Sequence, residues 1–367
     1  MDTRIAVLVP AYKERKVIGR TLEALFLAGV APADIFIVDD ASDDGTSEVV
    51  RRFESVNLLT LERNRGKAEA LNAALEHFQL WDRYTHITLL DADSRPAPNY
   101  FQVLVDEITA HPNVAIFVGQ VMNLRGGWIT AARAAEYGLN QAIFKLGQSR
   151  CGVVMVAPGC SSTYLASALR RLRFSGATLA EDMHITIACH RMGGEVRYVP
   201  KAKVFTQDPS TLRDYIRQVL RWYYGGFQVY RVERIFTFIE NFESLRKEPI
   251  DLLTMVRRFT YIRKQRIDAL MMYLVFEALA FSRITLLAVG VALVPSWDVL
   301  WFFPLDAAVS FVVALWFGVK LRRADVVYKF PMYFWVAYLN HVLYLWAMYQ
   351  VMWRKKTKTA WAKVKRY

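Results

Sequence analysis

Cysteine is scarce in this sequence, and two common nucleotide-binding motifs are missing from it. The 367 residues include three cysteines, Cys151, Cys160 and Cys189, without CxxC spacing. This excludes a disulfide framework and argues against a structural zinc site. The chain has neither a Walker A loop nor a GxGxxG motif, which argues against P-loop NTPases and dinucleotide enzymes. Internal repeats and low-complexity segments are also lacking.

The apolar residues are unevenly distributed along the chain. They make up 54% of it, which excludes a disordered or fibrous protein. The residue pattern of 1–260 is typical of a soluble α/β enzyme, whereas that of 267–353 is typical of a membrane region. The first apolar run, Ile5–Val9, is too short for a signal peptide or a membrane span. We therefore expect the N-terminal part to stay in the cytoplasm.

Strand and helix patterns alternate in the first part of the chain. Runs rich in Val, Ile and Leu predict strands at 4–9, 35–38, 57–61 and 86–90, with helices between them at 17–28, 42–53 and 67–78. Further strands are expected at 114–121, 152–156 and 195–199, and further helices at 128–146, within 178–191 and at 211–230. This α/β alternation predicts a parallel sheet with helices on both faces.

Carboxylates follow two of these strands, at the edge where ligands bind to such sheets. Asp91 and Asp93 flank one residue after the strand at 86–90, which suits Mg²⁺ or Mn²⁺ with positions left open for phosphate oxygens. Aspartates are also common in turns, so the pair alone does not identify a metal site. Asp40 suits hydrogen bonds from a nucleobase or ribose, and a cluster that caps the next helix, with Ser42, is the alternative.

Three further segments carry suitable side chains. Lys67 opens a helix, where its charge and free N–H groups suit a diphosphate or a base edge; an ordinary surface turn is the alternative. Asp182 follows Glu181 at a helix start and suits a general base, although such carboxylates are often only caps. The QxxRW pattern at 218–222 places an amide, a guanidinium and an indole on one helix face, which suits a pyrophosphate and a sugar ring.

The order of these segments resembles family 2 glycosyltransferases of the GT-A fold, specifically the membrane-integrated synthase branch. That branch includes cellulose, chitin, hyaluronan and poly-N-acetylglucosamine synthases. The resemblance covers about residues 3–225. Its motifs are VPAYKE at 9–14, DDAS at 39–42, NRGKAEALNAAL at 64–75, DADS at 91–94, PGCSSTYL at 158–165, AED at 180–182 and QVLRW at 218–222.

The resemblance implies a role for each motif in transfer from a UDP-sugar. Asp182 would be the catalytic base, and Asp91 and Asp93 would hold the diphosphate through Mn²⁺ or Mg²⁺. The donor would be bound by Ala11, Tyr12, Glu14, Asp40, Lys67 and Asp91. The acceptor sugar and the diphosphate would be contacted by Glu181, Gln218, Arg221 and Trp222.

The sequence departs from the family pattern in several places. Lys13 stands where the family usually has Asn, AED replaces TED, and PGCSST lacks the usual residue order. The synthases commonly carry spans before the catalytic domain, and none precedes it here. This argues against polymer translocation by a single protomer and leaves open a path shared between protomers of a homo-oligomer.

The expected organisation has four parts. They are a cytoplasmic GT-A domain at 1–226, amphipathic interfacial helices at 227–266, about three transmembrane helices at 267–353 and a basic tail at 354–367. Ordinary surface helices are the alternative for the second part. The spans are expected at 269–294, 297–319 and 332–353. Glu277 and Arg283 lie inside the first span, so these charges either pair across the bundle or line a polar path. The alternative is that this segment is an interfacial helix followed by a shorter span.

The net charge of +13 does not indicate nucleic-acid binding. The basic residues gather at 246–266, 320–323 and 354–366, beside hydrophobic spans, where the positive-inside rule and contact with anionic lipids explain them. Three crossings would place the basic tail outside the cell, whereas the positive-inside rule predicts that it stays in the cytoplasm. The number of crossings therefore stays open. The sequence predicts an integral membrane enzyme that extends a polysaccharide, with transfer of one sugar to a polyprenyl phosphate or glycolipid as the alternative.

Overall fold

The chain divides into two units, and the structure, a computed structural model, describes most of the first and part of the second. The first unit comprises residues 1–122 and 145–207, and the second comprises residues 123–144 and 208–367. The described residues are 3–124, 126–150, 152, 154–232 and 301–354. Residues 123–144 group with the C-terminal part, which differs from the division expected from the sequence.

Among the described residues, eight strands form one sheet in the order β3-β2-β1-β4-β7-β6-β8-β5. They are β1 (Ile5–Ala11), β2 (Ile35–Asp39), β3 (Asn57–Thr60), β4 (His86–Leu89), β5 (Arg95–Pro96), β6 (Val114–Asn123), β7 (Ser162–Leu165) and β8 (Glu195–Thr206). Strands β3, β2, β1 and β4 are parallel, as predicted. Strand β7 is antiparallel to β4 and to β6, and β5 is antiparallel to β8, so the sheet as a whole is mixed.

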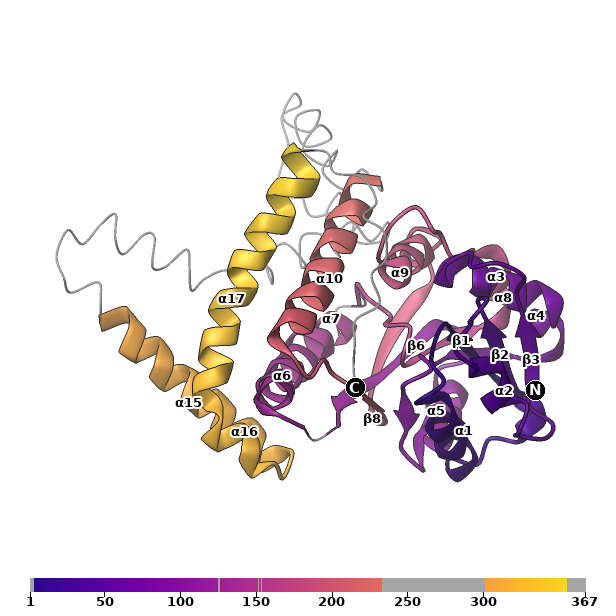
Figure 1. Ribbon diagram of the computed structural model, residues 1–367, viewed down its shortest axis with the longest axis horizontal. Coiled ribbons are helices and arrows are strands. Elements are labelled where there is room, and N and C mark those ends of the chain that lie inside the picture. The colour runs from indigo at the N-terminus through magenta and orange to yellow at the C-terminus, as the bar shows by residue number, and fades with distance from the viewer. Residues whose placement is uncertain (1–2, 125, 151, 153, 233–300, 355–367) are drawn as a thin grey trace, which may run out of the picture. The chain divides into compact units, whose positions relative to one another are not determined.

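Helices cover both faces of this sheet because successive residues of its central strands are apolar on either side. Ala6 and Leu8 pack in the core on one face, and Val7 and Val9 pack in the core on the other. Figure 1 shows α3, α4 and α8 on one side and α1, α2 and α5 on the opposite side. The helices are α1 (Ile18–Leu27), α2 (Thr46–Val50), α3 (Lys67–His77), α4 (Leu80–Arg83), α5 (Tyr100–Ala110), α7 (Leu146–Arg150), α8 (Ala166–Arg171) and α9 (Glu181–Arg191), with a 3₁₀ turn, η1 (Pro32–Asp34).

The described part of the second unit is helical. Its elements are α6 (Trp128–Leu139), most of the π-helical turn η2 (Asn140–Lys145), α10 (Leu212–Val232), α15 (Phe302–Lys320), α16 (Ala324–Tyr328), α17 (Phe330–Met348) and η5 (Tyr349–Trp353). Helices α6, α10 and α17 share a core that includes Ala135, Tyr215 and Val336. Gly138 of α6 lies so close to Phe317 of α15 that a Cβ atom there would be 2.5 Å from the ring.

Several predicted elements differ from those observed. The helix expected at 42–53 is reduced to α2, because Ser42 donates its N–H to Asp39 Oδ1 and Gly45 adopts a left-handed φ of 89°. The described residues of 152–156 form no strand, and β7 forms in the PGCSSTYL motif instead. The helix expected at 128–146 ends as an α-helix at Leu139, where the π-helical turn begins. The sequence patterns did not indicate α5.

One helix among the described residues, α15, is long and apolar enough over Phe303–Lys320 to cross a membrane, by length and composition alone. Only 28% of that segment is buried. The span expected at 332–353 falls on α17 and η5, which do not meet the same standard. The span at 269–294, residues 233–266 and the tail from 355 lie outside the described residues. Three transmembrane helices are therefore not confirmed.

Candidate active site

Acidic and basic side chains meet at the carboxyl ends of the parallel strands in the first unit. Lys67 is the first residue of α3, Asp91 follows β4, and Glu181 is the first residue of α9. The Lys67 Nζ lies 2.7 Å from Asp91 Oδ1 and 3.1 Å from Glu181 Oε1. Three residues that the sequence analysis assigned to separate motifs therefore surround one ammonium group.

The ammonium of Lys67 stays charged in this setting. Burial by itself would lower the pKa of Lys67, but the carboxylates of Asp91, Glu181 and Asp182 raise it above its ordinary value. The Lys67 side chain remains 30% exposed, so a ligand has access to it. A cation with partial access suits the negative charge of a diphosphate.

Gly159, in the PGCSSTYL motif, packs directly against this ammonium. A Cβ atom at position 159 would lie 2.6 Å from Lys67 Nζ and 3.9 Å from Asp91 Oδ1. A Cβ atom at this position would therefore require the Lys67 ammonium to shift. No sequence pattern singles out Gly159, since a Pro-Gly pair by itself indicates only a turn.

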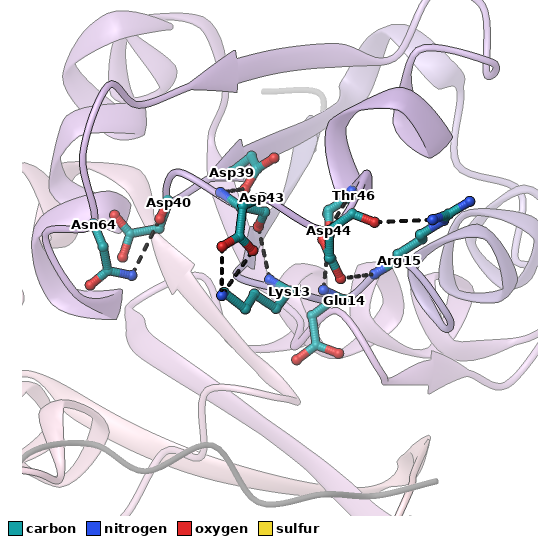
Figure 2. Close-up of polar contacts among 10 residues, drawn as sticks. Lys13, Glu14, Arg15, Asp39, Asp40, Asp43, Asp44, Thr46 and Asn64 are labelled. Atoms are coloured by element: carbon teal, nitrogen blue, oxygen red, sulfur yellow. Dashed lines mark hydrogen bonds and ion pairs between the residues drawn. The ribbon is translucent and has the colours of Figure 1, made fainter.

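Asp40 organises the loop that leads into α3. Its Oδ1 accepts the N–H of Arg65 at 2.7 Å, and its Oδ2 accepts the N–H of Gly66 at 2.8 Å. Asn64 Nδ2 donates to the carbonyl of Asp40 at 3.2 Å (Figure 2). Burial raises the pKa of Asp40, and the two N–H groups oppose that rise. Asp40 therefore places the start of α3, and with it Lys67.

The loop after β1 binds the loop after β2 (Figure 2). The N–H of Lys13 donates to Ser42 Oγ at 2.8 Å, and the N–H of Glu14 donates to Thr46 Oγ1 at 2.9 Å. Lys13 has a left-handed φ of 56°, a conformation that Asn adopts more easily than Lys. Its ammonium lies 2.8 Å from Asp43, and this hydrogen bond raises the pKa of Lys13 and lowers the pKa of Asp43.

The remaining donor-site candidates lie beside these loops. Ala11 ends β1, and its carbonyl accepts the N–H of Asp40 at 2.9 Å. The half-buried ring of Tyr12 has its centroid 5.5 Å from Lys13 Nζ. The structure therefore brings Ala11, Tyr12, Glu14 and Asp40 to neighbouring strand ends in the same unit as Lys67.

The turn that carries Asp91 and Asp93 is stabilised by hydrogen bonds from α1 and within the turn itself. Thr21 Oγ1 of α1 donates to the carbonyl of Ala92 at 2.7 Å, and the N–H of Ser94 donates to the carbonyl of Asp91 at 2.9 Å. Asp93 is only 4% exposed. Within the described part of the chain, no group of three or more His, Cys, Asp and Glu side chains forms a complete metal site. Two carboxylates fit a Mg²⁺ or Mn²⁺ ion whose coordination is completed by substrate phosphates.

Asp182 lies in the first turn of α9, directly after Glu181. Its Oδ1 accepts the N–H of Met183 at 2.8 Å, and its carbonyl accepts the hydroxyl of Thr186 at 2.6 Å. The half-buried carboxylate acts electrostatically on both Lys67 and Lys145, whose pKa values it raises. A carboxylate beside this cationic centre can accept a proton from a hydroxyl group.

Lys145 and Cys160 are two further groups near this centre that the sequence analysis did not place there. Burial lowers the pKa of Lys145 to about 8, against the opposing effects of Cys160 and Asp182. Burial raises the pKa of the Cys160 thiol to about 12. The Lys145 ammonium donates to the carbonyl of Val156 at 3.3 Å. No local pattern indicates such a lysine, because its burial depends on segments distant in sequence.

The QxxRW pattern lies on α10 in the second unit, which confirms the predicted helix. Gln218 is buried, Arg221 is half-buried, and Trp222 is 39% exposed. The guanidinium carbon of Arg133, on α6, lies 4.7 Å from the centroid of the Trp222 ring. No sequence pattern indicates a role for Arg133, since an arginine in an Ala-rich helix is usually a surface residue.

Comparison with known proteins gives sequence relatives. The sequence profile of Glycosyltransferase like family 2 matches residues 3–225. The chain is 26% identical over 234 residues to poly-beta-1,6-N-acetyl-D-glucosamine synthases of Staphylococcus epidermidis and Staphylococcus aureus. The match covers 61% of this chain and 55% of those proteins, so the chain spans about half the length of these relatives.

Solved structures with a similar fold are also known. A mannosyltransferase from Pyrobaculum calidifontis, PcManGT, in complex with GDP-Man and Mn²⁺, has a TM-score of 0.56 at 19% identity, over 97% of this chain and 89% of its own. TarS 1–349 of S. aureus, in complex with UDP-GlcNAc, has a TM-score of 0.50 at 16% identity, over 89% of each chain. The likeness establishes the GT-A-like α/β fold that the sequence predicted.

Proposed function

This chain belongs to the glycosyltransferase like family 2, and we propose that it is an inverting enzyme that transfers a sugar from a UDP-sugar. The observation that carries the proposal is the Lys67 ammonium, which lies 2.7 Å from Asp91 and 3.1 Å from Glu181 at the carboxyl edge of the sheet. A nucleoside diphosphate leaves with negative charge, and a fixed cation stabilises that charge as it develops. The UDP-GlcNAc named in the TarS complex supports UDP as the nucleotide, while the GDP-Man of PcManGT makes GDP the nucleotide to test against it.

In the proposed reaction, the acceptor hydroxyl oxygen attacks the anomeric carbon, the bond from that carbon to the diphosphate breaks, and the configuration inverts. Asp182 accepts the proton of the attacking hydroxyl. Lys67 and Arg221 stabilise the negative charge on the departing UDP. A Mn²⁺ or Mg²⁺ ion held by Asp91 and Asp93 would neutralise diphosphate charge. The nucleoside is assigned to Ala11, Tyr12, Glu14 and Asp40.

The proposed acceptor is the end of a growing polysaccharide. The names of the staphylococcal relatives, which are polymer synthases, support this choice. The exposed indole of Trp222 suits stacking on a sugar ring, and Gln218 and Glu181 are assigned to the same acceptor and diphosphate contacts. Aromatic stacking can hold the terminal sugar ring without reading its linkage.

We assign the protein to a membrane, with its catalytic domain on the cytoplasmic side. Large apolar side chains of α15, among them Val312 and Val319, are exposed, and so is Trp335 of α17. Lipid contact would bury such surfaces. The same observation favours a second candidate function, the transfer of a single sugar to a polyprenyl phosphate or glycolipid, because that acceptor is itself in the membrane.

The test uses purified full-length protein with Mn²⁺ and a panel of UDP-sugars, with GDP-mannose as a further donor. Release of the nucleoside diphosphate is measured, and the products are sized before and after organic extraction. UDP release with a ladder of long products supports the synthase. One sugar on an extractable lipid supports the second candidate instead. Turnover of GDP-mannose alone, or of no donor, contradicts the proposal of a UDP-sugar donor.

A further inference from the structure

We propose that Arg133 is a positioning residue that holds the Trp222 indole in place for the acceptor sugar. The proposal rests on the acceptor role assigned above to Trp222 and goes beyond it, because Arg133 lies outside every motif of the family resemblance. All residues that support it belong to the second unit.

Arg133 is a fully buried charged residue with two acidic partners. Its side chain is 0% exposed, and its Nε donates to Asp208 Oδ1 at 3.0 Å, where Asp208 is itself almost completely buried. Its Nη1 lies 3.9 Å from Glu136 Oε2. Burial by itself would lower the pKa of Arg133, but Tyr137, Asp208 and Glu136 raise it, so the guanidinium remains charged. A buried charge of this kind needs its partners, because an unpaired one is costly.

The guanidinium faces three aromatic rings. Its central carbon lies 4.6 Å from the Tyr137 centroid, 5.3 Å from the Tyr215 centroid and 4.7 Å from the Trp222 centroid. Tyr137 and Tyr215 are core residues or close to the core, whereas Trp222 is partly exposed. A planar guanidinium stacks on aromatic faces in a way that a lysine ammonium does not. Arg133 therefore connects the tyrosine rings in or near the core to the partly exposed indole of Trp222.

The surroundings of Arg133 are tied to two other helices. The Tyr215 hydroxyl of α10 donates to Asn340 Oδ1 of α17 at 2.7 Å, and Asn340 Nδ2 donates to Glu136 of α6 at 3.3 Å. These bonds hold α6, α10 and α17 together around the guanidinium. Because Arg133 is fixed in this way, the Trp222 ring that it contacts loses little freedom when a sugar stacks on it. Such preorganisation increases the affinity for the sugar. An apolar side chain at position 133 would fill the core without supplying this contact.

The variant Arg133→Lys keeps the charge but removes the planar group. With UDP-GlcNAc as donor and β-1,6-linked N-acetylglucosamine oligomers as acceptor, we expect the acceptor KM to rise on the order of tenfold. The donor KM and the acceptor-independent hydrolysis of UDP-GlcNAc should stay unchanged. The matched control is Arg170→Lys, at a surface arginine that also lies 3.0 Å from an aspartate, Asp82. An equal loss in hydrolysis and transfer would overturn the proposal, because it would indicate only a structural role.

A double-mutant cycle tests whether Arg133 acts through Trp222. If it does, Arg133→Lys adds no further loss to Trp222→Ala, and additive losses contradict the proposal. Should Arg133→Lys fail to fold, Tyr137→Phe serves instead, since it removes a hydroxyl that accepts a hydrogen bond from Arg133 and should raise the acceptor KM by a smaller factor.

A fluorescence measurement keeps this proposal separate from the proposed function. The emission of Trp222 is obtained as the difference between a protein and its Trp222→Phe counterpart. In the Arg133→Lys background, the emission and acrylamide quenching of Trp222 should change, and in the Arg170→Lys background they should not. An unchanged signal overturns the role of Arg133, whereas failure of the wild type to use any donor contradicts only the proposed function.

Discussion

The Nζ atom of Lys67 lies 2.7 Å from Oδ1 of Asp91, across a sequence separation of 24 residues. The contact joins the start of α3 to the turn after β4. Glu181, at the start of α9, also contacts the Lys67 ammonium. Because these three charged groups are in direct contact, replacing any one of them changes the electrostatic potential at the proposed diphosphate site. The first predictions follow from this arrangement.

Replacing Lys67 with Met keeps much of the aliphatic stem and removes the cation. We expect kcat for UDP release to fall by roughly 10²–10³, the loss found when a preorganised stabilising group is removed. Lys201, which is exposed, gives the matched control Lys201→Met, and this variant should keep full activity. Steady-state assays at saturating donor distinguish the two, and wild-type kcat in Lys67→Met would refute the role.

Introducing a methyl group at Gly159 should displace Lys67 without removing it. The Cβ of Gly159→Ala would lie 2.6 Å from Nζ, so the ammonium must shift and its distances to the carboxylates change. We expect weaker donor binding and lower kcat in a folded protein. Gly127→Ala is the control, because its Cβ would meet nothing within 4 Å. Equal donor affinity in both variants, measured by calorimetry with UDP, would count against the close packing of Gly159 on Lys67.

The carboxylate of Asp182 should matter for transfer and not for donor binding. Asp182→Asn is expected to lower the transfer rate by roughly 10²–10⁴, the contribution of a general base, with UDP affinity unchanged. The exposed Asp106 provides the control Asp106→Asn. If Asp182→Asn loses nucleotide affinity, the residue belongs to the donor site and the base must be sought elsewhere.

Removal of divalent cations should stop the reaction. We expect EDTA to abolish UDP release and added Mn²⁺ to restore it, because Asp91 and Asp93 supply hard oxygen ligands that a diphosphate completes. Asp93→Asn should lower both activity and Mn²⁺ affinity, whereas Asp43→Asn, at an exposed carboxylate paired with Lys13, should change neither. Full turnover in EDTA would exclude the proposed metal.

Stability should depend on pH through Lys145. Burial lowers the pKa of Lys145 from 10.5 to about 8, so the unfolded chain binds a proton between these pH values that the native state does not. The contribution of Lys145 to stability therefore rises with pH across this range and is least favourable below pH 8. We expect Lys145→Met to raise the Tm at pH 7, with a gain that shrinks towards pH 10. Thermal unfolding at several pH values, with Lys201→Met as control, measures this, and a gain independent of pH would contradict it.

Two elements show where the sequence patterns failed. The helix expected to start at Ser42 begins only at Thr46, because the side chain of Ser42 accepts the N–H of Lys13 from the loop after β1. Strand β7 was missed because its buried residues include serine and threonine and so lack an apolar pattern. Thr163 is accommodated by a hydrogen bond of 2.8 Å to Thr88 on the neighbouring strand. At Thr163 a partner distant in sequence outweighs the local preference, and at Ser42 such a partner adds to the local effects of Asp39 and the left-handed Gly45.

The sequence by itself determined the four parallel strands, the helices between them and the motifs at the strand ends. Each of these depends on residues next to one another in the chain, such as the apolar runs that a sheet covered on both faces requires. Only the tertiary structure decided that Lys67 meets Asp91 and Glu181, that Gly159 leaves room for them, and that Arg133 lies beneath Trp222. Those contacts join segments that are distant in sequence, and the burial that gives them their strength exists only once the chain has folded.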